Sequence, residues 1–512
     1  MTNGSPNVLY DALLGSPRDP AKALIRRPDG GEISYGEMIA LTGRLANALV
    51  ALSVEPGDRV AVQVEKSPEA LALYLATVRA GAVFLPLNTA YTATEIGYFV
   101  GDAAPSLIVC DPRSEKVLHE IDRDAAAALR TLDADGAGSL MDLAAGQPDD
   151  FANVPRAAED LAAILYTSGT TGRSKGAMLS HANLLDNART LVEAWRFTSD
   201  DVLLHALPIY HTHGLFVACN TVMVSGGSMI FLPKFDADAI ISHLPDATSM
   251  MGVPTFYTRL LPREDFTKPL VAHMRLFTSG SAPLLAETHV EFEERTGHRI
   301  LERYGMTETN MNTSNPYDGE RRAGTVGFPL PGVSLRIAHP ETGEELAAGK
   351  IGMIEVKGPN VFSGYWRMPE KTASEFRPDG FFITGDLGQI DEDGYVHIVG
   401  RQKDLIISGG FNIYPKEIEL VLDELDGVAE SAVIGVPHPD FGEGVVAVIV
   451  PKKGAKLSED GVKAAIGDRL ARFKQPKRVF FADALPRNTM GKVQKNVLRD
   501  EHGAEFKETT GA

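Results

Sequence analysis

The sequence has little cysteine and no excess of positive charge. Its 512 residues include only two cysteines, Cys110 and Cys219, which are far apart, lie in apolar segments and lack metal-ligand spacing. We expect both to be buried thiols of a protein in a reducing compartment. The formal net charge is −18. It argues against nonspecific binding to nucleic acid or to an anionic membrane, because both need a basic face.

Long apolar runs are also missing. No segment reaches the roughly 20 apolar residues that a membrane-spanning helix needs, and the N-terminal residues lack the basic and apolar regions of a secretory signal. We therefore expect a cytoplasmic protein. The composition, 44% hydrophobic and 23% charged, is that of an ordinary globular protein. The length predicts two or more domains.

Short runs rich in Val, Ile and Leu alternate with helical patterns through much of the chain, as in the strand predicted at 58–66 and the helix at 67–81. This alternation predicts an α/β fold, with layered α/β sheets in a large N-terminal domain. From about residue 322, turn-punctuated strands indicate a β-rich subdomain. The Ala/Asp-biased stretch 122–138 is interpreted as a surface helix and loop.

A smaller α+β unit is predicted after Arg401, so we divide the chain into domains 1–401 and 402–512. Residues 429–451 have the pattern of two strands around a turn. A capped amphipathic helix is expected over residues 458–474, beginning at Ser458.

The stretch YTSGTTGRSKGAMLSH, residues 166–181, packs glycines, hydroxyls and a lysine behind a predicted buried strand. Glycines let backbone N–H groups turn toward a ligand, hydroxyls donate to phosphate oxygens, and Lys175 supplies charge. It is not a Walker A loop, because Gly176 rather than Ser or Thr follows the lysine. We predict phosphate binding over an ordinary turn, and a following helix capped near Ser180. The residues expected to bind phosphate are Ser168, Gly169, Thr170, Thr171, Gly172 and Lys175.

Four more motifs follow in order: ERYGMTET (302–309), GFFITGDLG (380–388), GRQKDLIISGGFNIYPKEIE (400–419) and PRNTMGKVQKNVLR (486–499). Each has an ordinary structural explanation by itself. A Thr-Glu pair often caps a helix, and basic C-terminal tails are usually only solvated. Asp386, at a predicted strand end, could accept two ribose hydroxyl protons.

Together these motifs resemble the acyl-adenylate-forming superfamily, from about residue 30 to about 500. Within it, the sequence is most similar to malonyl-CoA and methylmalonyl-CoA synthetases. The segments that carry this finer likeness are LPIYHTHGLF, MGVPTFYTRLL, LFTSGSAPLL and ERYGMTETNMNTSNPYDG.

The resemblance implies a two-step ligase. A carboxylate attacks the α-phosphorus of MgATP, releasing pyrophosphate, and CoA thiol then displaces AMP. Lys492 would bridge the carboxylate and the α-phosphate, Thr307 would contact that phosphate, and Glu308 would ligate Mg²⁺, a hard cation suited to carboxylate oxygen. The loop from Thr167 to Lys175 would hold the β- and γ-phosphates. The remaining ATP-binding positions implied are Ser281, Ala282, Pro283, Glu302, Arg303, Tyr304, Gly305, Met306, Asp386 and Arg401.

For the second step, the resemblance implies that a small, mobile C-terminal domain rotates about a hinge at Lys403. The ordinary alternative for Lys403 is a solvated loop lysine. Rotation would bring Ser408, Gly409, Gly410 and Phe411 to a pantetheine tunnel, where glycines let a thin chain pass the backbone.

The acid is expected to be malonate, and methylmalonate as well, because the resemblance pairs Arg259 with a distal carboxylate. A guanidinium donates a bidentate fork to such a group, whereas an ordinary helical arginine would face solvent. His211 and Ser279 would be hydrogen-bonding walls, with Met306 and Met311 limiting the pocket. A metal site at HTH (211–213) is disfavoured, because no Glu or Cys completes it.

Three alternatives stay open at this stage. The chain could be an acyl-CoA synthetase for medium-chain or aromatic acids, a stand-alone peptide-synthetase adenylation domain, or a nucleotide-binding regulator without catalysis. The expected partners are small molecules (ATP, CoA and the acid), with Mg²⁺ as cofactor and no nucleic acid or membrane. A monomer or homodimer is expected.

Overall fold

A computed structural model describes residues 7–15, 19–121, 128–167, 174–409, 411–488 and 491–506. The chain divides into two compact units. Unit 1 contains Met1–Leu335 and Val356–Phe382, and unit 2 contains Arg336–Glu355 and Ile383–Ala512.

Unit 1 is built on two large sheets. One has seven strands in the order β18-β8-β7-β4-β3-β5-β6, and the other has nine in the order β15-β14-β13-β12-β11-β9-β10-β1-β2. The strands of the first are β3 (Arg59–Gln63), β4 (Val83–Pro86), β5 (Leu107–Cys110), β6 (Ala128–Thr131), β7 (Leu161–Thr167), β8 (Lys175–Ser180) and β18 (Gly364–Tyr365). Those of the second are β1 (Ala23–Arg26), β2 (Glu32–Ser34), β9 (Val202–His205), β10 (Ser228–Phe231), β11 (Ser249–Gly252), β12 (Leu276–Ser279), β13 (Leu301–Met306), β14 (Asn310–Ser314) and β15 (Phe328–Pro329).

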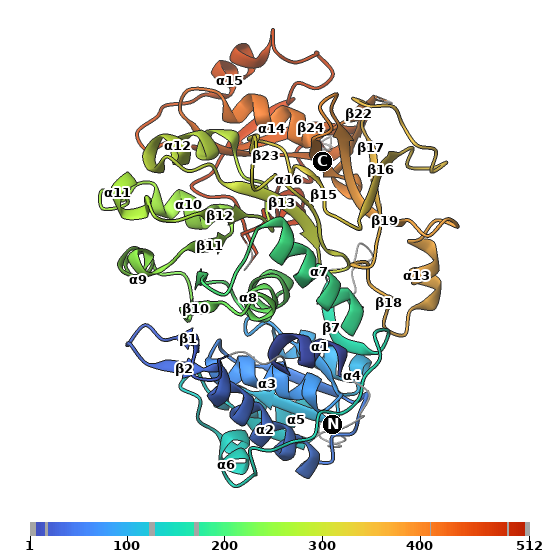
Figure 1. The fold of residues 1–512 in the computed structure, drawn as a ribbon. Helices are drawn as coiled ribbons and strands as arrows, with labels where there is room; N and C mark the ends of the chain where they lie inside the picture. Colours follow the sequence, from blue (N-terminus) through green and yellow to red (C-terminus); the bar gives the residue numbers. More distant parts are fainter. Residues whose placement is uncertain are drawn as a thin grey trace. The chain divides into compact units, whose positions relative to one another are not determined.

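Helices cover these sheets, as Figure 1 shows for the blue and green parts of the chain. Strands β3, β4, β9, β10, β11 and β12 are parallel to their neighbours and buried almost throughout, as expected for sheets covered by helices. The helices of unit 1 are α1 (Val8–Tyr10), α2 (Tyr35–Ala51), α3 (Pro68–Arg79), α4 (Ala93–Ala103), α5 (Glu115–Ile121), α6 (Ser139–Ala145), α7 (His181–Ala194), α8 (Asn220–Ser225), α9 (Ala237–His243), α10 (Pro254–Leu260), α11 (Lys268–Val271), α12 (Ala286–Thr296) and α13 (Pro369–Ser374).

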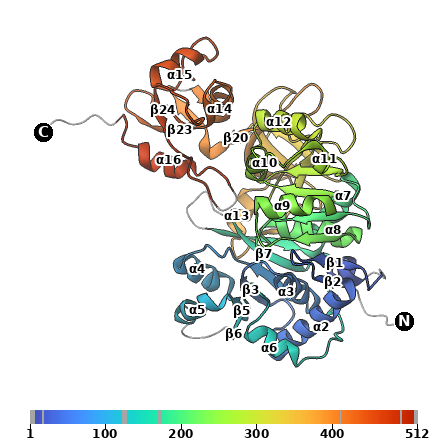
Figure 2. The same cartoon turned by 90° about the vertical axis from the view of Figure 1, so that its left-hand side faces the viewer.

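Unit 2 contains two smaller sheets, and Figure 2 shows the more C-terminal one with its helices in orange and red. A long antiparallel pair of strands, β23 and β24, forms its centre, and apolar side chains on both faces are buried. The strands are β16 (Ser334–Ala338), β17 (Gly352–Lys357), β19 (Phe382–Ile390) and β20 (Val396–Arg401) in one sheet, and β21 (Ile406–Ser408), β22 (Phe411–Ile413), β23 (Val428–His438), β24 (Gly442–Pro451) and β25 (Arg478–Phe481) in the other. The helices are α14 (Pro415–Asp423), α15 (Glu459–Ile466) and α16 (Lys495–His502).

The predicted α/β fold with a smaller α+β unit is confirmed. The predicted caps are also present: the Ser180 side chain accepts from Asn183 N at the start of α7, and Ser458 accepts from Gly461 N at the start of α15. The helix predicted over 458–474 is shorter than expected, because α15 ends at Ile466 and a glycine, Gly467, follows it. Both cysteines are buried thiols. The interpretation of 122–138 as helix and loop is wrong at β6, which pairs with β5 as an edge strand of the sheet. A tertiary partner overrides the local Ala-rich pattern there.

The division into compact units differs from the predicted boundary at Arg401. The β-rich strands β19 and β20 belong with the C-terminal elements, because β20 packs on α14. A hinge is defined by motion rather than by packing, so the boundary 1–401 and 402–512 stays a prediction. None of the described helices is long and apolar enough to cross a membrane.

Candidate active site

The predicted phosphate loop connects two neighbouring strands of unit 1. Strands β7 and β8 are antiparallel, and Thr167 pairs with Lys175 at their ends. The Lys175 side chain is buried, and its ammonium lies 3.0 Å from Glu375 Oε1. The five predicted residues Ser168, Gly169, Thr170, Thr171 and Gly172 lie outside the described residues. The structure thus fixes both ends of the loop and gives it a buried cation.

The motif ERYGMTET forms the hairpin of β13 and β14. Gly305 has no room for a side chain, because a Cβ there would lie 1.8 Å from Asn310 O. Asn310 takes the left-handed conformation, with φ 49°. This tight turn carries half-buried Thr307 and buried Glu308 between the two strands.

Glu308 has hydroxyl partners but no cation in the described part of the chain. Its Oε1 accepts from Thr167 Oγ1 at 3.2 Å and from the Tyr365 hydroxyl at 3.1 Å. Only 5% of the residue is exposed. A buried carboxylate without a counter-ion, beside a phosphate-binding loop, fits the donor chemistry of Mg²⁺. Glu308 is therefore a suitable magnesium ligand.

The predicted adenine-binding turn follows β12. Ser281 takes the left-handed conformation, with φ 70°, which is costly for a residue with a Cβ and is typical of functional sites. Its Oγ lies 3.2 Å from His213 Nδ1. Ala282 is half-buried, Pro283 is exposed, and Tyr304 is buried on β13. Glu302, on the same strand, is buried against His289.

Arg303 is a buried guanidinium, two of whose nitrogens lack partners among the described atoms. Only 3% of the residue is exposed, and neither Nε nor Nη2 has a hydrogen-bond acceptor among the described atoms. It lies against the turn after β12, because a Cβ on Gly280 would meet Arg303 Nη1 at 2.4 Å. Burial lowers the pKa of Arg303 to about 9, so the group is still protonated at neutral pH. Such a charge needs an anion beside it.

Two further buried polar atoms in unit 1 lack partners among the described atoms, and the ring of one of them, His213, lies near Arg303. Ser279 Oγ and His213 Nε2 are buried and have no acceptor or donor among the described atoms. Burial, with Arg303 as the nearest charge, lowers the pKa of His213 well below its usual value, which makes it neutral at pH 7. A charged donor and a neutral imidazole are therefore close to one another. Together they can bind a carboxylate.

Arg259 does not have the burial that was expected of it. It is exposed on the last turn of α10, and its guanidinium carbon lies 5.6 Å from the centroid of the Phe235 ring. An exposed arginine carries no desolvation penalty, whereas the buried Arg303 does, so Arg303 is the guanidinium that needs an anion beside it. Binding of substrate by Arg259 stays a prediction.

The remaining acid-site predictions fall in unit 1. His211 is half-buried, and its Nδ1 accepts from His213 N. Met306 is half-buried and Met311 is buried, with the Met311 Cε 2.4 Å from the position of a Cβ on Gly305. Met311 therefore packs against a glycine, which is consistent with its predicted role in limiting the size of the acid pocket.

The predicted ribose-binding pair lies in unit 2. Asp386 on β19 pairs with Arg401 on β20, and Arg401 Nε lies 2.8 Å from Asp386 Oδ1. Asp386 is buried, and its N–H donates to Thr384 Oγ1. The arginine thus fixes the orientation of the carboxylate that is expected to accept from ribose hydroxyls.

The other C-terminal predictions lie on loops and short strands of unit 2. Lys403 is exposed in a single 3₁₀ turn, as a hinge lysine and a solvated lysine would both be. Ser408 is buried, Gly409 has φ 59°, and Phe411 is exposed and stacked on Phe473, while Gly410 lies outside the described residues. Lys492 is exposed in a turn, where its N–H donates to Asn488 Oδ1.

Sequence reasoning missed three residues near the phosphate loop: Tyr365, Lys371 and Glu375. Tyr365 is buried, and its hydroxyl lies 2.6 Å from Glu375 Oε2 as well as near Glu308. Burial, with Glu308 and Glu375 nearby, raises the pKa of Tyr365, so the phenol stays protonated. The feature of the sequence that could have identified them is the presence of a tyrosine, a lysine and a glutamate within the one short segment 365–375.

Comparison with protein families gives two matches along this chain. The AMP-binding enzyme family matches residues 16–366, and the AMP-binding enzyme C-terminal domain matches residues 417–492. The first match alone covers more than half of the chain.

Three relatives illustrate the range of similar proteins. The crystal structure of ATP-bound MatB from Rhodopseudomonas palustris is 63% identical, with a TM-score of 0.96 over 98% of this chain and 100% of that one. A malonate–CoA ligase of Arabidopsis thaliana is 34% identical, over 97% of this chain and 89% of its own length. A feruloyl-CoA synthase of an Amycolatopsis species is 37% identical, over 93% of this chain and 95% of its own length.

Proposed function

Because this chain belongs to the AMP-binding enzyme family, we infer that it is an AMP-forming acyl-CoA ligase, and we propose malonate or methylmalonate as its acid. The observation that carries the choice of acid is Arg303, a buried guanidinium with two unpaired nitrogens. We therefore assign Arg303, which the resemblance implied as an ATP-binding position, to the distal carboxylate instead. A monocarboxylic acid uses its only carboxylate for the reaction and would leave this charge unpaired. A diacid brings a second carboxylate that can accept from it.

The first step joins the acid to AMP. An oxygen of the reacting carboxylate attacks the α-phosphorus, and the bond from that phosphorus to the pyrophosphate oxygen breaks. We assign Lys492 to the charge that develops on the α-phosphate and Thr307 to hydrogen bonding at the same group. Glu308 would hold Mg²⁺, which when bound neutralises phosphate charge.

The second step moves the acyl group to CoA. The thiolate sulfur attacks the acyl carbon, and the bond from that carbon to the AMP oxygen breaks, giving the thioester and AMP. Residues Ser408 and Gly409 are assigned to the pantetheine passage, with Lys403 as the hinge. These roles rest on the motifs and remain part of the proposal.

An acid panel tests the proposal. Malonate, methylmalonate, propionate, hexanoate and ferulate are each incubated with the enzyme, ATP, Mg²⁺ and CoA, and the thioester is read by mass. Malonate or methylmalonate is expected to give the highest kcat/KM. Propionate, which has the same three carbons without the second carboxylate, is the matched substrate control. Faster turnover of hexanoate or ferulate would refute the diacid assignment.

Two arginine variants identify the group that binds the distal carboxylate. Arg303→Met is expected to lower kcat/KM for malonate by a factor of about 10²–10⁴, because charge-assisted hydrogen bonds contribute about 1.5–3 kcal/mol each. Arg259→Met tests the original prediction. If only Arg259→Met loses activity with malonate, the exposed arginine rather than the buried one recognises the diacid.

The similarity to a feruloyl-CoA synthase keeps an aromatic acid as the second candidate. Its identity to this chain is close to that of the malonate–CoA ligase, so overall similarity to these two relatives does not separate the acids. The unpaired charge of Arg303 favours the diacid.

A further inference from the structure

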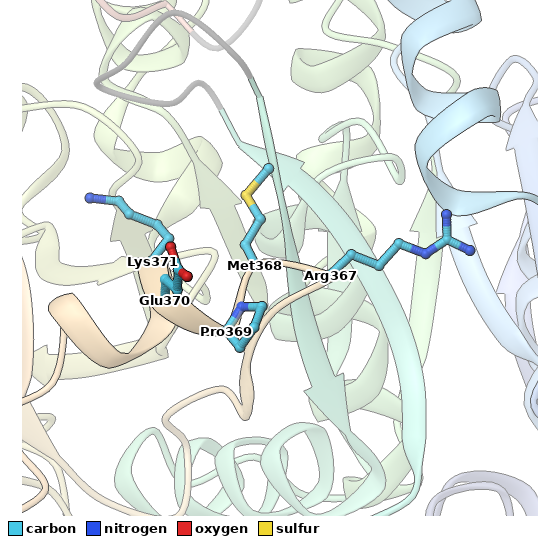
Figure 3. Close-up of a pocket in the computed structure, with 5 residues that line it drawn as sticks. All are labelled: Arg367, Met368, Pro369, Glu370 and Lys371. Atoms are coloured by element: carbon cyan, nitrogen blue, oxygen red, sulfur yellow. The ribbon is translucent and has the colours of Figure 1, made fainter.

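A cluster of charges lies beside the phosphate loop on a segment with no assigned role. In unit 1, residues 367–371 line an open pocket of about 400 Å³, shown in Figure 3. The side chains of Arg367 and Lys371 extend from it in different directions (Figure 3). Arg367 donates to Asp102 O at 2.8 Å, so its guanidinium is already bound to the backbone of another segment. Lys371 instead extends toward Glu375, with which it forms an ion pair.

Glu375 holds two ammonium groups on one oxygen. Its Oε1 lies 3.0 Å from Lys175 Nζ and 2.6 Å from Lys371 Nζ. Its Oε2 accepts from the Tyr365 hydroxyl at 2.6 Å. Burial raises the pKa of Glu375, but the hydrogen bonds from Lys371, Tyr365 and Lys175 outweigh it and lower the pKa overall. The carboxylate is therefore ionised and accepts from three donors.

Backbone contacts bring this cluster to the phosphate loop. Strand β18, which carries Tyr365, pairs with β8, and Trp366 N donates to Gly176 O. Phe362 N donates to Glu308 O, which anchors the same segment at the predicted magnesium ligand. The Lys175 ammonium also lies 4.0 Å from the centroid of the Tyr365 ring. Two elements far apart in the sequence are thus fixed side by side.

We propose that Glu375 is an internal stand-in for phosphate, and that Lys371 is a second cation, beside Lys175, for the pyrophosphate part of ATP. Without nucleotide, the carboxylate neutralises both lysines, because a buried Lys175 without a partner would be strongly destabilising. When the polyphosphate binds, its oxygens take over the two ammonium groups. After the bond to the α-phosphorus breaks, Glu375 competes for them again and favours release of pyrophosphate.

The difference in charge between pyrophosphate and a carboxylate favours the exchange of Glu375 for pyrophosphate at the two lysines. Pyrophosphate carries more negative charge than one carboxylate and offers more acceptor oxygens, so two preorganised ammonium groups bind it with little further loss of side-chain freedom. The proposal goes beyond the proposed acid substrate and depends only on ATP being used. It therefore survives if malonate proves to be the wrong acid.

Binding of inorganic pyrophosphate to the full-length protein, measured by calorimetry without acid or CoA, tests this assignment. Glu375→Gln removes the competing charge and is expected to lower the Kd for pyrophosphate about tenfold, or about 1.4 kcal/mol. Lys371→Met is expected to raise that Kd at least fivefold, and Lys371→Arg to keep it within threefold of wild type. The Kd for AMP, which lacks the pyrophosphate group, is expected to stay within twofold in all variants.

A matched control is Glu291→Gln, which removes a carboxylate of the same type from an exposed position on α12. It is expected to leave the pyrophosphate Kd within twofold, so a change in net charge alone does not explain the result. Damage to the structure would weaken binding in both Glu375→Gln and Lys371→Met, whereas the proposal requires opposite changes. A weaker or unchanged Kd in Glu375→Gln, or an unchanged Kd in Lys371→Met, overturns the proposal.

Discussion

Replacing Arg303 by methionine is expected to stabilise the substrate-free protein while removing its use of malonate. In the folded protein, burial holds the guanidinium pKa near 9, below its ordinary value of 12.5. At 1.36 kcal/mol per pKa unit, keeping this group charged costs about 4–5 kcal/mol at neutral pH. Below pH 9 the folded protein bears the whole of this destabilisation. Between pH 9 and 12.5 the folded state has lost the proton while the unfolded chain still keeps it, so stability rises with pH until the destabilisation disappears.

The expected gain in stability is smaller than the full penalty. Replacing buried charges by apolar side chains of similar size stabilises proteins by about 1–4 kcal/mol, and we expect about 1–3 kcal/mol here. Unit 1 has roughly 360 residues, so at about 2.1 cal/mol/K of unfolding entropy per residue the Tm rises by about 1–4 °C. Calorimetry or a thermal shift assay without substrate measures this rise.

The same variant changes the response to malonate. Wild-type Tm is expected to rise with malonate concentration, whereas Arg303→Met is expected to show no malonate-dependent rise, because the distal carboxylate has lost its partner. The kcat/KM for propionate is expected to change less than tenfold. A fall in Tm without substrate, or an equal loss of activity with propionate and malonate, would contradict the argument from an unpaired charge.

Arg321→Met is the matched control. This arginine is also partly buried, but it donates to the backbone carbonyls of Pro316, Tyr317 and Arg299. The same substitution leaves those carbonyls without donors and is expected to lower stability by about 1–3 kcal/mol. Changes in stability of opposite sign for Arg303→Met and Arg321→Met would distinguish an unpaired guanidinium from a structural one.

Three further predictions use other parts of the chain. Lys492→Ala is expected to abolish malonate-dependent exchange of pyrophosphate into ATP but to keep thioester formation from supplied acyl-AMP; equal loss of both would argue against two separate half-sites. Gly305→Ala is expected to lower unit 1 stability by about 2–3 kcal/mol, because its Cβ would meet Asn310 O at 1.8 Å, and an unchanged Tm would contradict that packing. Burial raises the pKa of Asp423 to about 6, so the folded state binds more protons than the unfolded chain between pH 4 and 6 and stability falls as pH rises there. Asp423→Asn is therefore expected to stabilise unit 2 by about 1–3 kcal/mol at pH 8 and to give no gain near pH 4; urea titrations at the two pH values measure the difference.

Local chemistry in the sequence was sufficient for much of the fold. The strand at Leu161–Thr167 and the helix caps at Ser180 and Ser458 depend on neighbouring residues, and the structure contains all three. The tight turn of ERYGMTET is also local, since Gly305 is required by contact with a residue five positions away. Strand β6 was missed because its stability comes from pairing with β5 rather than from its own composition.

The sequence by itself determined the α/β class and the order of the motifs, because these depend on patterns and spacing along the chain, and the resemblance of those motifs to a known family predicted the site positions. Only the tertiary structure decided which arginine is buried, Arg303 rather than Arg259, since burial depends on what packs above a residue. It also decided that Glu375 pairs with Lys175 across 200 positions of sequence. Ion pairs and desolvation act through space, and contacts of that range leave no periodic signal in the chain.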